Sequence, residues 1–157
     1  MTRWAVLALL VAAHPAAARD SLGVYSDWAA FRDPETPRCY AIAQGTGSQA
    51  YATIGTWPEK RLRNQFHLRL SRPASEQRKA QLRIGNSRFD LVTRGSDAWA
   101  SDEATNAAII AAMRSARRMS VSGFDERGRS FVDRYDLEGA ATAMDAAVVG
   151  CAGARRS

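Results

Sequence analysis

Short segments in which apolar and polar residues alternate recur along most of the chain, separated by turns rich in glycine, proline and asparagine. A period of two is typical of β-strands that bury one face. The clearest example is 64–71, where Phe66, Leu68 and Leu70 share one face and His67 lies on the other, which we expect to be wet. We predict strands at 28–31, 39–43, 51–57, 64–71, 80–84, 87–92, 119–124 and 130–137.

One segment before the last two strands follows the helical period instead. It begins at Ser101 or Asp102, both good capping residues, and is expected to run to about residue 117. Ile109, Ile110 and Met113 form its apolar face. A helix with one narrow apolar face is suited to pack on a sheet while its other side stays wet.

A second helix is predicted after Gly139, over 140–151, with Ala140, Met144 and Cys151 on one stripe. The pattern therefore predicts an α+β, β-rich fold: an antiparallel sheet or sandwich of about seven or eight strands with two helices and one disulfide. We expect a single domain over 19–151 and a disordered tail over 152–157.

The predicted hairpin 80–92 presents an electrostatic problem. A two-residue turn at Gly85-Asn86 places Leu82 opposite Phe89, a favourable core pair. The same register places Arg83 opposite Arg88 on the outer face, where like charges repel. Either the turn is longer than two residues, or the two arginines share an anion or Asp90.

The last predicted strand, 130–137, also contains one unexpected charge. Its alternation places Asp133 on the apolar face with Phe131 and Tyr135. A buried carboxylate needs a partner, because an unpaired charge in a core is costly. Asp133 is then either a functional acid or, as we favour, turned outward by a β-bulge beside Arg134 or Arg127.

The first eighteen residues have the features of a secretory signal peptide. Arg3 precedes ten apolar residues, 4–13, and Ala16-Ala17-Ala18 offers a small-residue cleavage site, so we predict cleavage after Ala18. The alternative, a membrane anchor, would need roughly 20 apolar residues. We therefore expect a periplasmic or secreted protein that is not transmembrane after cleavage.

The two cysteines of the chain, Cys39 and Cys151, are expected to form a disulfide, as is usual for two cysteines in an exported protein. The alternative is a reactive thiol, which requires a neighbour that promotes the thiolate. Neither cysteine belongs to a CxxC motif or adjoins a histidine. Closing a loop between residues 112 positions apart is worth roughly 4 to 5 kcal/mol in the chain-entropy model.

Two stretches of the chain resemble the invasion-associated locus B family, small exported proteins of alphaproteobacteria. They are Cys39-Tyr40-Ala41-Ile42-Ala43 and the pattern Gly123-Phe124-Asp125-x-x-Gly128-Arg129-x-Phe131-x-Asp133-x-Tyr135-x-Leu137-x-Gly139 that leads to Cys151. The likeness extends from about Trp28 to Cys151. It implies export, a cysteine bridge and a β-rich domain with two helices, and it supplies no catalytic residues.

Catalytic motifs are not evident. His67 is the one histidine left after cleavage, no GxSxG motif is present, and the sequence shows no metal-ligand spacing. We therefore predict no catalytic, cofactor-binding or metal-binding residues and no cofactor. The leading hypothesis is a non-catalytic exported domain that binds a protein partner or an envelope component; a small periplasmic hydrolase is an alternative.

The charge of the chain suggests a further alternative, binding to an anionic lipid or lipopolysaccharide surface. Removing the signal peptide removes only Arg3, so the net charge falls from +6 to +5. Because the arginines are scattered among acidic residues, net charge alone does not mark a binding face. The helix dipole likewise explains Arg114, Arg117 and Arg118 without an anion. Nucleic acid is not an expected partner, and the candidate surface residues are Arg61, Arg63, Arg83 and Arg88.

Overall fold

The computed structural model describes residues 19–153, and the predicted signal peptide lies outside them. Ten antiparallel strands form one sheet in the order β1-β2-β3-β4-β5-β8-β7-β6-β9-β10, so the predicted β-rich α+β class is confirmed. The strands are β1 (Asp20–Tyr25), β2 (Trp28–Asp33), β3 (Arg38–Gln44), β4 (Tyr51–Trp57), β5 (Leu62–Arg69), β6 (Ala80–Ile84), β7 (Ser87–Arg94), β8 (Asp97–Ala100), β9 (Arg118–Phe124) and β10 (Ser130–Asp136). The helices are α1 (Glu103–Ser115) and α2 (Ala140–Gly153).

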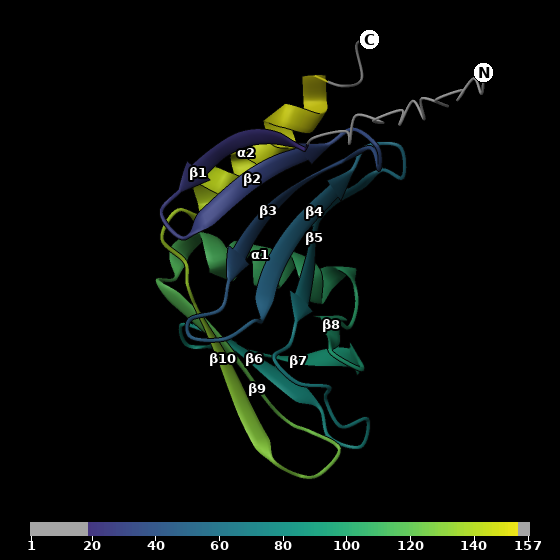
Figure 1. Cartoon of the computed structure of the whole chain (residues 1–157), viewed down its shortest axis with the longest axis vertical. Helices are drawn as coiled ribbons and strands as arrows, with labels where there is room; N and C mark the ends of the chain where they lie inside the picture. Colours follow the sequence, from purple (N-terminus) through teal and green to yellow (C-terminus); the bar gives the residue numbers. More distant parts are fainter. Residues whose placement is uncertain (1–18, 154–157) are drawn as a thin grey trace, which may run out of the picture.

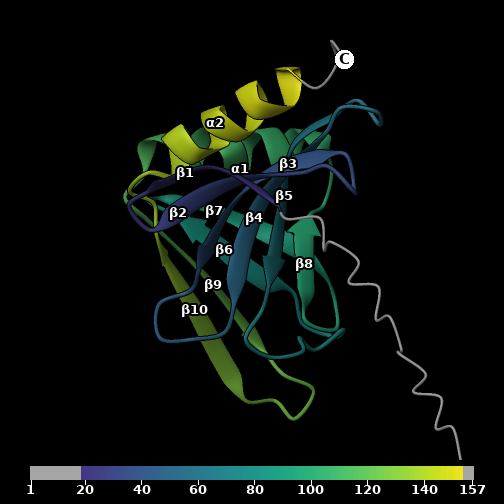
Figure 2. The ribbon, with the colours of Figure 1, turned by 45° about the horizontal axis from the view of Figure 1, so that its top comes forward.

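Both helices pack on the same face of the sheet (Figure 1 and Figure 2). Helix α2 contacts β1 to β4, whereas α1 contacts mainly β5 and β8. The alternating residues on this covered face are buried, as in β6, where Ala80, Leu82 and Ile84 are buried and the residues between them are exposed. The hydrophobic core therefore lies between the sheet and the two helices. We call the opposite face of the sheet, which carries no helix, the outer face.

The sheet curves strongly enough to bring distant strands together. The indole nitrogen of Trp28 on β2 donates a hydrogen bond to the carbonyl of Asp136 on β10 at 2.9 Å. The amide of Thr46, in the β3–β4 loop, donates to the carbonyl of Arg134 at 2.8 Å. Strand β10 is the last in the sheet order, so these bonds fasten one edge of the sheet to its opposite half.

Two strands were not predicted. Strand β1 is joined to β2 by the two-residue turn Ser26-Asp27, and its residues are exposed or only partly buried. Strand β8 has four residues and follows the turn Gly95-Ser96. A strand without a fully buried residue and a strand of only four residues both give a weak alternating signal. The sheet therefore has ten strands rather than seven or eight.

Helix α1 ends earlier than predicted. Asp102 is its cap and accepts a hydrogen bond from the amide of Thr105 at 2.7 Å, but the helix stops at Ser115. Arg114 lies in the last turn and forms an ion pair with Asp145 of α2 at 2.8 Å. Arg117 and Arg118 follow the helix, so the dipole accounts for Arg114 and not for them.

Asn106 of α1 completes the hydrogen bonding of β5. Strand β8 pairs only with residues 67–69 of β5, so the first part of β5 has no strand partner on that side. The Asn106 side chain takes this place, accepting from the amide of Phe66 at 2.9 Å and donating to the carbonyl of Asn64 at 3.0 Å. Backbone groups in a core need such partners, so one polar side chain belongs on this mostly apolar helix face.

The predicted outward turn of Asp133 is wrong. Strands β9 and β10 pair without a bulge, and Asp133 faces the core with an exposed fraction of 2%. One of its carboxylate oxygens accepts a hydrogen bond from the amide of Ser71 at 2.9 Å. Ser71 lies near the start of the segment that links β5 to β6, so Asp133 anchors this connection to β10. The buried carboxylate thus has a structural partner.

Helix α2 extends to Gly153, two residues past the predicted end, and 154–157 lie outside the described residues. Its predicted stripe is buried at Ala140, Met144 and Cys151, which contact the covered face of the sheet. The residues of this stripe are mostly small, which allows the helix to lie close to β2 and β3. That close approach positions Cys151 beside Cys39.

Candidate functional site

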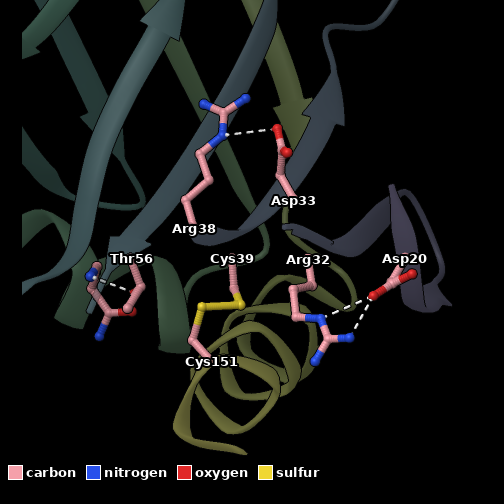
Figure 3. The surroundings of a disulfide bond; sticks show 8 residues. Asp20, Arg32, Asp33, Arg38, Cys39, Thr56 and Cys151 are labelled. Carbon is pink, nitrogen blue, oxygen red and sulfur yellow. Dashed lines mark hydrogen bonds and ion pairs between the residues drawn. A yellow bond between two sulfur atoms is a disulfide. The ribbon is translucent and has the colours of Figure 1, made fainter. Parts of the chain in front are cut away.

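The predicted disulfide joins Cys39 of β3 to Cys151 of α2, with the two sulfur atoms 2.05 Å apart and both residues buried. Figure 3 shows the bond between the strand and the C-terminal part of the helix. Beside it, Arg32 pairs with Asp20 at 2.6 Å, and Arg38 lies 3.7 Å from Asp33. The bond closes most of the domain into one covalent loop, so the two cysteines have a structural role.

His67 lies on the outer face, as the alternation predicts, but it is half-buried rather than fully wet. Its Nε2 atom is 2.9 Å from an Asp97 carboxylate oxygen, and its Nδ1 atom is 3.3 Å from the hydroxyl of Thr53. Arg69 donates to the other oxygen of Asp97 at 2.8 Å. We call these four residues the histidine cluster. They come from three neighbouring strands: β4, β5 and β8.

Aromatic rings flank the histidine cluster. The centroid of the His67 ring is 5.6 Å from that of Trp99 and 6.4 Å from that of Tyr51. Trp99 is opposite His67 in the pairing of β5 with β8, and Thr53 is opposite it in the pairing with β4. The cross-strand register therefore holds the imidazole between a hydroxyl and an indole.

The charges of the histidine cluster compensate one another. Desolvation raises the pKa of Asp97, but the hydrogen bonds from Arg69 and His67 and their charges outweigh it, so the pKa of this carboxyl lies below its ordinary value. The hydrogen bond to Asp97 and its negative charge in turn raise the pKa of Arg69. Asp97 and Arg69 are thus stabilised in their charged forms by each other.

The Thr53–His67–Asp97 row is similar in composition to a hydroxyl, imidazole and carboxylate triad. Acyl transfer also needs hydrogen-bond donors aimed at the developing oxyanion. Thr53 lies within β4, whose backbone is paired with β3 on one side and β5 on the other. The neighbouring backbone amides are therefore engaged in the sheet, and the geometry favours a structural role for this row.

The four predicted surface arginines do not form one patch. Arg61 and Arg63 belong to the β4–β5 hairpin, and Arg83 and Arg88 to the β6–β7 hairpin. Strand β8 separates these hairpins in the sheet order. The register of the second hairpin is the predicted one, with Leu82 opposite Phe89 and Arg83 opposite Arg88.

A groove on the outer face lies over β6, β9 and β10 and has a volume of about 1160 Å³. We call it the arginine groove, because four arginines line it: Arg83, Arg117, Arg118 and Arg134. Asp136 and Glu138 also line it, so basic groups outnumber acidic ones. Within residues 19–153, none of these four arginines has a carboxylate oxygen within 4.0 Å.

Of the groove arginines, only Arg83 was among the predicted surface residues. Arg134 is the outward neighbour of Tyr135, so the alternation of 130–137 contained the signal for it. Arg117 and Arg118 were assigned to the helix end, and only the observed end at Ser115 places them in the groove. Residues from three separate segments meet there because the sheet curves and α1 ends beside β9.

In the described part of the chain, no group of three or more histidine, cysteine, aspartate or glutamate side chains is placed to hold a metal ion. Nor does any helix within that part have the length and apolar character needed to cross a bilayer.

The chain is similar in fold to a protein of known structure. Invasion associated protein B from Bartonella henselae aligns with 81% of this chain and 95% of its own length, with a TM-score of 0.62 and 12% sequence identity. No protein-family model matches the chain, and no curated protein matches it by sequence. At 12% identity the likeness establishes a common fold, which agrees with the family resemblance of the sequence at that level.

Proposed function

We propose that the protein is an exported, non-catalytic domain of the invasion-associated locus B type that binds a protein partner or an envelope component. The observation that carries the proposal is the buried Cys39–Cys151 disulfide. Structural disulfides persist in oxidising compartments and are rare in the cytosol. The signal-like residues 1–18 and the fold shared with invasion associated protein B point in the same direction.

The non-catalytic part of the proposal is supported by the histidine cluster. Both ring nitrogens of His67 are within hydrogen-bonding distance of neighbouring side chains, and the amides around Thr53 belong to the sheet. A small hydrolase would need an available base and an oxyanion site. A broad panel of ester, amide and glycoside substrates tests this point. Turnover that is abolished by His67→Ala and unaffected by Asp90→Asn contradicts the proposal.

Export is tested by producing the full chain in a Gram-negative host and fractionating the cells. We expect a periplasmic product that begins at Arg19, with both cysteines resistant to alkylation until a reductant is added. Leu9→Arg interrupts the apolar run, so this control variant should stay in the cytoplasm. Full-length wild-type protein in the cytoplasm with two alkylated thiols contradicts the proposal.

Binding to an anionic surface is a second candidate function, and the arginine groove is the observation that favours it. The predicted residues Arg83 and Arg88 lie at or beside the groove, whereas Arg61 and Arg63 belong to another hairpin. This difference provides a matched comparison, because pairs of arginines can be removed inside and outside the groove with the same change in net charge.

A further inference from the structure

Three arginines of the outer face lie in one cross-strand row. Arg88 is opposite Arg83, Arg83 is opposite Ser120, and Ser120 is opposite Arg134, across β7, β6, β9 and β10. Residues opposite one another point to the same side of a sheet, and neighbouring strands lie about 4.8 Å apart. Arg83 and Arg134 are two strands apart, so their Cα atoms are separated by roughly 10 Å, with the Ser120 hydroxyl between them.

Backbone contacts hold the other two groove arginines in place. The carbonyl of Arg117 accepts a hydrogen bond from the amide of Leu137 at 2.9 Å, and the carbonyl of Arg118 accepts one from Gly85 at 3.5 Å. These contacts fasten the α1–β9 link to the residue that follows β10, and the start of β9 to the β6–β7 turn. The positive charges of the groove therefore come from several elements, and hydrogen bonds between the backbones of these elements hold them together.

Two acidic residues near the groove, Asp136 and Asp90, have partners outside the arginine row. A carboxylate oxygen of Asp136 accepts a hydrogen bond from the amide of Glu138 at 3.0 Å. Asp90, the acidic residue closest in sequence to Arg88, is 3.3 Å from the amine of Lys79. Neither carboxylate forms an ion pair with Arg83, Arg88 or Arg134 within the described residues.

The structure thereby removes two of the three explanations for the Arg83–Arg88 pair. The β6–β7 turn has two residues and is not longer, and Asp90 is paired with Lys79. The remaining explanation is an anion that the arginines share. Guanidinium groups are well suited to phosphate, because their planar, forked donors match its oxygens.

We propose that the arginine groove binds a ligand with a phosphate group, which lies between Arg83 and Arg134 and accepts a hydrogen bond from the Ser120 hydroxyl. Arg117 and Arg118 contact the remainder of the ligand. A soluble phosphate ester and the headgroup of an anionic lipid share this chemistry. The inference deepens the proposed function by naming the chemistry of an envelope component, and its lipid source rests on export.

The test uses the purified mature chain, residues 19–157, and two probes in phosphate-free buffer. Tripolyphosphate is titrated by calorimetry, and phosphatidylcholine vesicles with or without phosphatidylglycerol are co-sedimented with the protein. The groove variant is Arg83→Ser with Arg134→Ser. Its matched control is Arg61→Ser with Arg63→Ser, which removes the same charge from the β4–β5 hairpin. Urea unfolding of each variant shows that the fold is retained.

We expect the wild-type chain to bind a probe with an affinity that falls as salt is added. The groove variant should bind at least about tenfold more weakly, because charge-assisted hydrogen bonds are lost, and the control should bind like wild type. Binding of tripolyphosphate alone supports a soluble ligand, and binding of phosphatidylglycerol vesicles supports a headgroup.

The proposal is overturned if the wild-type chain binds neither probe, or if the two double variants lose equal affinity, since net charge would then explain the binding. A failure of export leaves these measurements valid, because they use purified protein. If the protein is exported but binds neither probe, the proposal of phosphate binding in the groove is rejected and the proposed function is retained.

Discussion

The two faces of the sheet hold their polar residues under opposite conditions. On the covered side, Asn106 of α1 and Asp133 of β10 are buried, and their side chains bond to backbone groups that would otherwise lack a partner. On the outer face, Arg83, Arg88 and Arg134 repel one another in a single row without a carboxylate partner. Folding therefore accounts for the first set, whereas the second set has no carboxylate partner within the described residues, and this is why we propose the ligand site there.

The histidine cluster differs from both sets. It lies on the outer face, yet Asp97 and Arg69 are paired within the chain, and His67 is placed between Asp97 and Thr53. A conspicuous constellation of chemical groups is therefore not by itself a sign of function. What distinguishes the arginine groove is that its four arginines outnumber its two acidic residues and form no ion pair within the described residues.

The largest effect on the covered face should come from removing the disulfide. We expect Cys39→Ala with Cys151→Ala to lower the free energy of unfolding by roughly 4 to 5 kcal/mol, because the unfolded chain regains the entropy of an open loop. Urea unfolding measures this loss. A reductant should destabilise the wild-type chain similarly and leave the double variant unchanged. A loss below about 1 kcal/mol contradicts the loop-closure argument.

Removing a polar partner from the core should have the next largest effect. Asn106→Leu leaves the amide of Phe66 and the carbonyl of Asn64 without a partner. We expect a loss of about 3 kcal/mol in the free energy of unfolding, since an unsatisfied buried group costs about 1 to 3 kcal/mol. Ala108→Leu, at an exposed position of the same helix, is the control and should be nearly neutral. Equal stability of both variants refutes the role assigned to Asn106.

The histidine cluster should contribute less to the free energy of unfolding, and its contribution should depend on pH. The folded-state pKa of Asp97 is lowered, so its stabilisation is present above the unfolded pKa and is lost as pH falls through the folded pKa. At neutral pH, Asp97→Asn should cost about 1 kcal/mol or less, because this partly exposed pair is screened by solvent. Thermal unfolding from pH 7 to about pH 2 should show this difference vanishing.

A matched control for this prediction is Asp90→Asn, whose carboxylate is more exposed and pairs only with Lys79. It should cost less than Asp97→Asn at neutral pH. If the stability difference between wild type and Asp97→Asn grows as pH falls, the sign of the argument is wrong.

The smallest effect should be a gain, on the outer face. Arg88→Ser removes the repulsion with Arg83, so we expect stability to rise by a few tenths of a kcal/mol at low salt. The gain should shrink at high salt, where the charges are screened. Arg94→Ser, on the same strand but opposite Asp97, should give no gain. Destabilisation by Arg88→Ser in anion-free buffer would mean that the row is internally compensated, contrary to the comparison of the two faces.

Much of the fold followed from local pattern. Alternation predicted eight of the strands, helical spacing predicted both helices, capping residues predicted the start of the first helix, and two cysteines predicted the disulfide. Periodicity and capping depend only on residues that are close together in the sequence. The disulfide prediction depends only on an exported chain having two cysteines. The sequence alone is therefore enough to predict these features. Strand β8 escaped prediction because its four residues give too short a pattern.

The tertiary structure alone decided what the polar residues do. Arg83, Arg118 and Arg134 are far apart in sequence, and only the order β6-β9-β10 and the early end of α1 bring them together. Asp133 looked misplaced because its partner, the amide of Ser71, is a backbone group that no sequence pattern identifies. The sequence by itself determined the helices, the strands and the disulfide, because periodicity is a local property and only two cysteines are present. Whether a charged side chain has a partner depends on its neighbours in space, so only the folded sheet decided which charges are paired.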